Sequence, residues 1–262
     1  MRMMGAQRLA SIRETVQENG FVSVREIMDT YHVSRSSAMR DLDELEKQGF
    51  LVRQRGGGVL KEKAQLLTPD NEQPVREKLD IQHAAKEAIC QAAGKLIQDG
   101  QCIFIDGGTT VLGLVPYLAQ KQVTLVTPST CLLERLPEDF PGKVFLVGGQ
   151  WQNGYAMSFG PLARAMVERF RFDLSFISCN GMEPAGDVSV FDFEVGEVKR
   201  TAMDKGAVKV LLADGSKFAS KAMCVFARMD MFDSVYTTQY PGTEIPGNVI
   251  LCESEEEEDE NN

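Results

Sequence analysis

Residues 106–110, with the sequence Asp-Gly-Gly-Thr-Thr, follow a short apolar run and carry groups that could bind an anion. Gly107 and Gly108 let a ligand approach the backbone closely and permit positive φ angles. Backbone N–H groups and the hydroxyls of Thr109 and Thr110 can donate hydrogen bonds to a phosphate at the start of a helix. The spacing differs from Gly-x-x-x-x-Gly-Lys-Ser/Thr, so it does not indicate an ATP or GTP site. Taken alone, the segment is equally compatible with a phosphate site and with a simple turn.

Small, hydroxylated or charged residues also follow other apolar runs, where they could complete such a site. Lysine can neutralise a phosphate, and carboxylates suit the hydroxyls of a sugar. The candidate residues of this site are Asp106, Gly107, Gly108, Thr109, Thr110, Ser129, Gly148, Gly149, Ser158, Gly160, Gly181, Glu194, Lys199, Asp214 and Lys217. A structural interpretation is open for some of them. Glu194 and Lys199 would belong to an ion-paired helix surface, and Asp214 would cap a turn or a helix.

An alternation of strands and helices would have to position these side chains. The expected strands are 102–105, 123–127, 144–147, 174–178, 208–213, 234–238 and 249–251. The expected helices are 76–98, 111–120, 129–136, 160–170 and 194–205. This order predicts a mostly parallel sheet with helices on both faces. Ligands bind such sheets at the carboxyl ends of the strands, which is where the candidate residues lie.

The first sixty residues predict a different, mainly helical unit. Apolar residues recur at helical spacing through 6–19, and a glycine follows. Ser23 precedes a glutamate by three positions, a capping-box pattern that opens a second helix. Ser34 can cap a third helix that ends at Gly49.

The third helix has one apolar side and one side suited to DNA. Ala38, Leu42 and Leu45 share a narrow arc that must face the core. The opposite side presents serines near its N-terminus and Arg40 one turn later. Such hydroxyls can reach phosphates or bases, and arginine can form two hydrogen bonds to guanine in the major groove. The alternative is an ordinary solvated face of a small helical domain.

Residues 50–60 alternate apolar and polar side chains around a cationic, glycine-rich turn, which predicts a β-hairpin. After three helices, such a hairpin makes a winged helix-turn-helix, with Arg53 and Arg55 along the phosphates or in the minor groove. The candidate DNA-binding residues are Ser34, Arg35, Ser36, Ser37, Arg40, Lys47, Arg53, Arg55, Gly56 and Gly57.

Charge and composition are compatible with this interpretation. The net charge is −10, but residues 1–60 hold nine lysines and arginines against eight acids. Seven acids lie in the last eleven residues, which we expect to be a disordered tail. The six cysteines form no Cys-x-x-Cys pair, so neither a metal site nor a disulfide framework is expected. No apolar run reaches 18 residues and no secretory signal is evident, so we expect a cytoplasmic protein.

The N-terminal region resembles the DeoR family of bacterial transcription regulators. The matching residues are Val33, Ser34, Arg40, Asp41, Leu42, Leu45, Glu46, Leu51, Arg53, Gly56 and Gly57. Two positions depart from the family pattern. Met39 stands where the family usually has the first of two arginines, and Arg55 stands where it usually has histidine. The resemblance therefore implies DNA binding but leaves the operator sequence open.

The remainder of the chain resembles the sensor domain of the same family through the segments IDGGTT, GPLA, EVGEVKR and LLADGSKF. The resemblance implies an α/β fold akin to ribose-5-phosphate isomerase and coenzyme A transferases. Gly107 replaces a usual serine, and Pro128 replaces a usual asparagine, so the ligand could differ from that of relatives. We therefore expect a winged helix-turn-helix domain at 1–60, a linker at 61–75, a sensor domain at 76–252 and an acidic tail at 253–262.

An enzyme needs an acid–base group beside its substrate, and Glu194, Asp214 or Lys217 could serve in principle. The histidines, His32 and His83, lie in the DNA-binding region and the linker helix. A DNA-binding head joined to a phosphate site favours a regulator without cofactor or metal. The resemblance implies that a phosphorylated sugar alters operator affinity in a homodimer or homotetramer, usually relieving repression. Two alternatives stay open: a sugar-phosphate isomerase or transferase with a vestigial head, and a DNA-binding architectural protein that senses no ligand.

Overall fold

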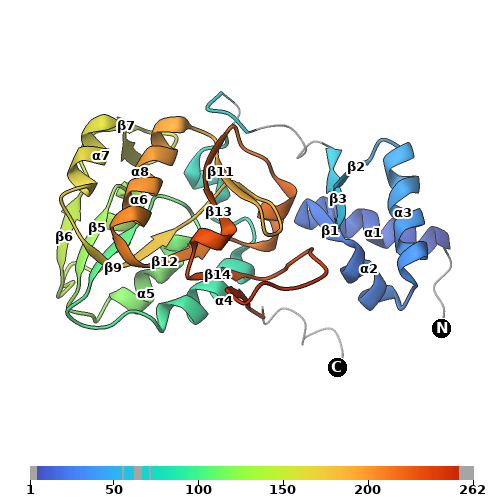
Figure 1. Cartoon of the computed structure of the whole chain (residues 1–262), viewed down its shortest axis with the longest axis horizontal. Coiled ribbons are helices and arrows are strands. Elements are labelled where there is room, and N and C mark those ends of the chain that lie inside the picture. Colours follow the sequence, from blue (N-terminus) through green and yellow to red (C-terminus); the bar gives the residue numbers. More distant parts are fainter. Residues whose placement is uncertain (1–4, 55, 62–66, 71, 254–262) are drawn as a thin grey trace.

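The structure is a computed structural model, and it describes residues 5–54, 56–61, 67–70 and 72–253. The polypeptide forms a small N-terminal head at one end of the molecule and a larger α/β body at the other (Figure 1). The expected acidic tail lies almost entirely outside the described residues, as does Arg55.

The head combines three helices with a small antiparallel sheet. Its elements are α1 (Gly5–Asn19), β1 (Phe21–Ser23), α2 (Val24–Tyr31), α3 (Arg35–Lys47), β2 (Leu51–Gln54) and β3 (Gly57–Leu60). Strands β2 and β3 form the expected hairpin. Strand β1 pairs with the opposite edge of β3, so the order among the described strands is β1-β3-β2. This is the winged helix-turn-helix arrangement that the sequence predicts.

Local sequence explains where the helices of the head begin. The Ser23 hydroxyl accepts a hydrogen bond from the Glu26 N–H, and the Glu26 carboxylate accepts one from the Ser23 N–H, which completes the capping box. The Ser34 hydroxyl accepts from the N–H of Ser37 at the start of α3. The side chains of Ala38, Leu42 and Leu45 are fully buried in the core of the head. The predicted apolar face of the third helix is confirmed.

The larger body is built on a parallel sheet. Its strands are β4 (Cys102–Ile105), β5 (Thr124–Thr127), β6 (Lys143–Leu146), β9 (Phe172–Ile177), β12 (Gly206–Leu212), β14 (Ser234–Thr237) and β15 (Val249–Leu251). Within the described residues the order is β15-β14-β12-β9-β4-β5-β6, and every neighbouring pair is parallel. The expected parallel α/β fold is confirmed.

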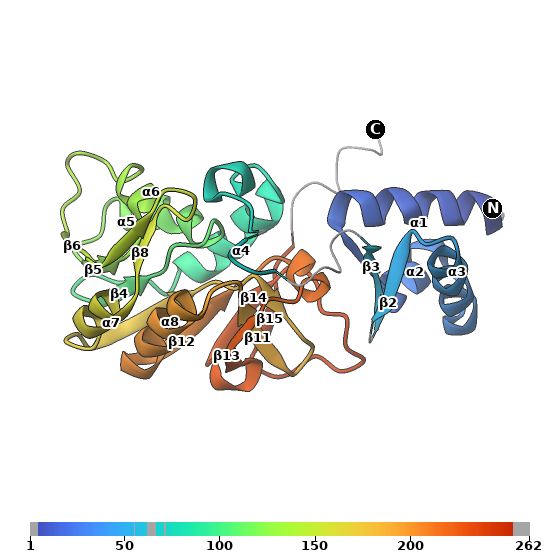
Figure 2. The same cartoon turned by 90° about the horizontal axis from the view of Figure 1, so that it is seen from above.

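Helices cover both faces of this sheet (Figure 2). One face is covered by α4 (His83–Gly94), η3 (Val111–Leu114), α5 (Val115–Leu118) and α6 (Thr130–Leu133), and the other by α7 (Pro161–Val167) and α8 (Phe193–Lys205). Successive side chains of a strand point to opposite faces. Accordingly, Ile103 and Ile105 pack in the core under α4, whereas Phe104 packs in the core under α8.

Some elements differ from the sequence expectation. The helix expected from residue 76 begins only at His83, because the 3-10 turn η2 (Val75–Lys78) precedes it and Gln82 has the left-handed φ of 57°. The helix expected at 111–120 is the 3-10 turn η3 followed by one α-helical turn, with Pro116 in the first turn of α5.

Short antiparallel strands were also missed. They are β7 (Gln150–Gln152) with β8 (Met157–Phe159), and β10 (Gly181–Met182) with β11 (Asp187–Val190) and β13 (Cys224–Arg228). Most are only two to four residues long, which is too short for an alternating pattern to be recognised. The remaining elements are the 3-10 turns η4 (Gly215–Ala219) and η5 (Met229–Met231).

The head contacts the larger body through its sheet. Phe21 of β1 and Val59 of β3 form a small buried cluster with Ala219 at the end of η4. The tip of the wing also meets the body, since a Cβ atom at Gly56 would lie 2.5 Å from the carbonyl oxygen of Pro241. The wing therefore lies between the α3 side of the head and the larger body (Figures 1 and 2).

We expect Gly57→Ala to destabilise the protein by about 1–3 kcal/mol, because the new methyl group overpacks the head. Its Cβ would lie 2.8 Å from the Phe21 ring and closer still to the Val22 carbonyl oxygen. Urea denaturation of the full chain measures the change. Gly247→Ala is the matched control, because its Cβ would meet nothing within 4 Å. Equal free energies of unfolding for Gly57→Ala and the parent would contradict this packing.

Candidate functional site

Helix α3 presents an open polar face on the side opposite its buried seam. Ser34, Arg35, Ser36, Arg40 and Lys47 are exposed, and Ser37 is half-buried. The Arg40 guanidinium donates from Nε to the Ser36 carbonyl at 3.2 Å, which lays the side chain along the helix surface. These side chains are available to a groove of duplex DNA. Their contact with DNA stays a prediction.

The wing arginine Arg53 is directed differently from the expectation. Its guanidinium forms an ion pair with Asp43 and donates to the Met39 carbonyl at 3.1 Å and to the Met39 sulfur at 3.0 Å. The arginine therefore packs the hairpin against α3 and does not point into solvent along a phosphate path. The Met39 sulfur is an acceptor here, a role that an arginine side chain, which has only donors, would not fill.

The wing glycines also have structural roles in this arrangement. Gly57 is buried against β1, and the Gly56 carbonyl accepts from the Val24 N–H at 2.8 Å while its α-carbon faces Pro241. The burial of Gly57 does not favour its expected role as a DNA contact, and for the half-buried Gly56 that role stays a prediction.

A buried ion pair lies where the carboxyl ends of β4 and β9 meet. Asp106 follows β4 and forms an ion pair with Lys199 of α8; their side chains are 1% and 4% exposed. Asp106 also accepts from the N–H groups of Gly108 at 2.8 Å and Ser178 at 2.7 Å. Lys199 donates further to the Ser178 carbonyl at 3.1 Å. The pair thus joins two strand ends to a helix.

This geometry corrects the expected role of Asp106. The carboxylate is saturated by hydrogen-bond donors of the protein and is fully buried, so it is not open to the hydroxyls of a ligand. Its function in the structure is to orient Lys199, Ser178 and the glycine turn that follows β4.

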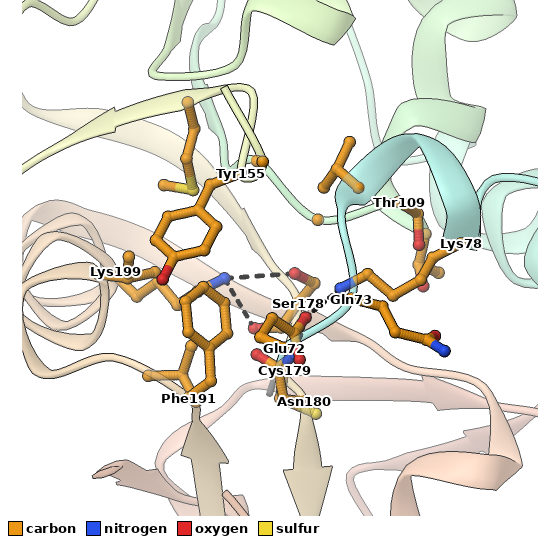
Figure 3. Close-up of a pocket in the computed structure, with 18 of the residues that line it drawn as sticks. Glu72, Gln73, Lys78, Thr109, Tyr155, Ser178, Cys179, Asn180, Phe191 and Lys199 are labelled. Atoms are coloured by element: carbon orange, nitrogen blue, oxygen red, sulfur yellow. Dashed lines mark hydrogen bonds and ion pairs between the residues drawn. The ribbon is translucent and has the colours of Figure 1, made fainter. Parts of the chain in front are cut away.

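A pocket opens beside this pair, with a free volume of about 50 Å³. Six of the candidate residues line it, namely Gly107, Gly108, Thr109, Thr110, Lys199 and Lys217. Tyr155 and Phe191 supply an aromatic wall, and their rings lie 4.5 Å apart between centroids. Figure 3 shows Lys199 and Lys78 on opposite sides of Ser178, Cys179 and Asn180. The site therefore combines ammonium groups, backbone N–H groups, hydroxyls and an apolar wall.

Other candidate residues serve the fold and do not line the pocket. Ser129 caps α6, Gly160 precedes α7 with φ of 89°, and Gly149 has φ of 148° in a close turn against Phe159. Gly181 packs against the Ser220 backbone, and Glu194 is in the first turn of α8. The other candidates outside the lining are Asp106, Gly148, Ser158 and Asp214.

Asp214 fits the capping interpretation. Its carboxylate accepts from the Ser216 N–H at 3.1 Å at the start of η4 and lies 3.9 Å from the Lys217 ammonium. Burial alone would raise the pKa of Asp214, but Lys217, the Ser216 hydrogen bonds and Lys86 together lower it. The hydrogen bonds of Asp214 and its lowered pKa support a capping role over proton donation.

The segment that joins the two halves contributes side chains that sequence reasoning missed. Glu72, Gln73, Val75 and Lys78 line the pocket. Glu72 pairs with Lys78, and its Oε1 accepts from the Asn180 amide at 2.9 Å. Burial lowers the pKa of Lys78, and Glu72 opposes this change. Glu72 and Lys78 are six positions apart in a polar, proline-containing segment, so neither periodicity nor a motif indicates them in the sequence.

Comparison with known proteins agrees with the division of the chain into a helix-turn-helix head and a larger domain. The profile of the DeoR-like helix-turn-helix domain matches residues 8–64, and that of the DeoR C terminal sensor domain matches residues 81–239. The chain belongs to the DeoR family. It is a DNA-binding transcriptional regulator and not an enzyme.

The DeoR-family relatives are similar along nearly their whole length. The glycerol-3-phosphate regulon repressor of Escherichia coli K12 is 28% identical over 91% of this chain and 93% of its own length. The transcriptional repressor GlcR of Bacillus subtilis is 26% identical over 91% of this chain and 90% of its own length. The lactose phosphotransferase system repressor of Staphylococcus aureus is 29% identical, with 87% and 90% covered.

Among solved structures, ribose-5-phosphate isomerase A of Methanocaldococcus jannaschii is similar at 15% identity, with a TM-score of 0.37 and 54% of each chain covered. None of the described helices is both long and apolar enough to cross a membrane.

We expect Asp106→Ala to destabilise the larger body by about 3–5 kcal/mol, because it leaves the Lys199 ammonium buried without its partner. Urea denaturation, followed by far-ultraviolet circular dichroism, measures the loss. Asp204→Ala breaks an exposed ion pair with Arg200 and should change stability by about 0–1 kcal/mol. An Asp106→Ala protein as stable as its parent would show that the pair does not hold the strand ends together.

Proposed function

We propose that the protein binds operator DNA through α3 and that a phosphorylated sugar in the pocket alters its operator affinity. The observation that carries the DNA part is the exposed Ser36 and Arg40 surface directly opposite a fully buried seam. That geometry allows a recognition helix to enter a major groove without uncovering the core. The names of the relatives, repressors of a glycerol-3-phosphate regulon and of a lactose phosphotransferase system, support a repressor of carbohydrate-use genes.

The chemistry of the pocket supports a phosphorylated sugar. Among the described lining residues, Lys78, Lys199 and Lys217 bring positive charge, and residues 107–110 bring backbone N–H groups and two hydroxyls. These donors match the oxygens of a phosphate monoester. Asn180 and Tyr155 can meet the hydroxyls and the apolar face of a sugar.

The turn η4 supports a physical route from the pocket to the head. Lys217 lines the pocket, and two residues later Ala219 packs against Phe21 and Val59 of the head. A ligand that binds more tightly when η4 has one placement than when it has another would therefore favour one orientation of the head relative to the larger body. A coupling of about 1–3 kcal/mol would change operator affinity about 5- to 150-fold.

We also propose a homodimer or homotetramer, because paired heads are needed to bind two half-sites. Exposed apolar side chains on the edge strand β6 (Phe145 and Leu146) and on β7 (Trp151) support self-association. We assign DNA binding to 1–60, the linker to 61–75, sensing to 76–252 and the tail to 253–262. As a DNA-binding regulator, the protein would act in the cytoplasm.

We expect Arg40→Ala to weaken specific binding by about 1–3 kcal/mol if the arginine contacts a base. The operator is first selected from random duplexes with the full chain, and affinities are then measured by fluorescence anisotropy at fixed salt. Arg164→Ala, on the exposed side of α7, is the control and should bind as the parent does. If Arg40→Ala binds the selected duplex as tightly as the parent, α3 is not the recognition helix.

We expect at least one sugar phosphate to weaken operator binding about 5- to 150-fold, while the matching unphosphorylated sugar has no effect. Lys217→Ala should need a higher concentration of that sugar phosphate, since it removes one ammonium from the pocket. The panel includes glycerol 3-phosphate and hexose and pentose phosphates. An operator affinity unchanged by every compound would favour a DNA-binding protein that senses no ligand.

A further inference from the structure

Glu72 is a buried carboxylate that comes from the segment between the two halves of the molecule. Its side chain is 3% exposed, although its neighbours Gln73 and Pro74 are exposed. Figure 3 shows Glu72 in the centre of the pocket, beside Ser178 and Asn180. An acidic side chain from a polar connecting segment has thus been inserted among the groups that would bind an anion.

Backbone hydrogen bonds anchor this segment to the larger body on both sides of Glu72. The Leu67 N–H donates to the Lys221 carbonyl at 2.8 Å, and the Leu67 carbonyl accepts from the Met223 N–H at 2.8 Å. On the other side, the Val75 N–H donates to the Gly154 carbonyl at 2.8 Å. The anchors hold Glu72 at the pocket, and the segment leads back along the chain to the wing.

The partners of Glu72 are the groups that an anionic ligand would use. Lys78 supplies an ammonium, and the Asn180 amide donates to Oε1 at 2.9 Å. A carboxylate and a phosphoryl group both accept charge-assisted hydrogen bonds from such donors. Lys217 and Lys199 are near enough to lower the pKa of Lys78, so the ammonium groups share one region of the pocket.

The hydrogen-bond partners of its carboxylate distinguish Glu72 from the other acids near the pocket. Each lysine among the described lining residues forms an ion pair with one carboxylate. Lys199 pairs with Asp106, Lys217 with Asp214, and Lys78 with Glu72. Asp106 and Asp214 also accept backbone N–H groups at strand ends, which fix them in place. Among the described residues, the Glu72 carboxylate accepts hydrogen bonds from the Lys78 and Asn180 side chains, so it can leave without breaking a strand end or a helix cap.

The free volume of the pocket also requires a side chain to move. About 50 Å³ is free, whereas sites for small molecules measure roughly 300–1,000 Å³. A sugar phosphate therefore requires side chains of the lining to move, and Glu72 is one of them.

We propose that Glu72 is an internal competitor that occupies an anion subsite formed by Lys78 and Asn180, and that a phosphoryl group displaces it. This inference rests on the proposed function, since it assigns a regulatory role to the same pocket. Displacement withdraws the Glu72 carboxylate from Lys78 and Asn180, while the backbone anchors at Leu67 and Val75 stay in place. Glu72 thereby raises the effector concentration that is needed to fill the site.

The test measures binding of inorganic phosphate to the full-length protein by isothermal titration calorimetry. Glu72→Gln keeps the shape of the side chain but removes its charge, so phosphate no longer competes with an ion pair. A competitor that occupies the subsite nine-tenths of the time weakens apparent affinity about tenfold, so Glu72→Gln should bind phosphate about tenfold more tightly. Glu77→Gln, an exposed acid on η2, is the control and should match the parent. Lys78→Gln should bind phosphate more weakly than the parent.

Equal or weaker phosphate binding by Glu72→Gln would overturn the inference, and so would a lack of phosphate binding by both proteins. If Glu72→Gln fails to fold, Glu72→Asp replaces it: the shorter carboxylate reaches Lys78 less well, and phosphate should again bind more tightly. Operator release by sugar phosphates is measured in parallel. If the parent and Glu72→Gln release the operator at the same concentration, only the inference fails; if neither responds to any sugar phosphate, the proposed function fails.

Discussion

The buried ion pair between Asp106 and Lys199 is the constraint on which the pocket depends. Two opposite charges that are almost fully removed from water must stay paired, because either one alone would be strongly unfavourable. The pair therefore fixes the end of β4, the start of the turn after β9 and the position of α8 relative to both. The glycine turn and the lysines are arranged around this fixed point.

The same constraint separates two kinds of charged residue in the larger body. Asp106 and Asp214 are structural carboxylates that hold backbone N–H groups at the edge of the sheet. Glu72 belongs to the connecting segment, and among the described residues its carboxylate accepts from the side chains of Lys78 and Asn180. These three acids thus differ in how easily a ligand could displace them, although all are buried and all face a lysine.

The sequence predicted those parts of the molecule that follow from periodic patterns and local caps. The buried seam of Ala38, Leu42 and Leu45, the cap at Ser34 and the parallel sheet all depend on neighbours in sequence. The pocket depends on contacts between distant residues, and these were only partly foreseen. Residues 107–110 were found because they follow a strand, whereas Lys78 and Asn180 carry no pattern. Asp106 and Lys199 were both identified as candidates, but not as a buried pair.

The contact of the wing with the larger body affects how substitutions in the head should be interpreted. Because Gly56 lies against Pro241 and Val59 packs with Ala219, the hairpin belongs to the boundary between the two halves as well as to the head. A genetic screen that finds loss of repression at Gly56 would therefore not identify a DNA contact by itself. The same phenotype would arise if a bulkier side chain pushed the head away from the sensor, and only variants assayed for both operator affinity and ligand response can separate these causes.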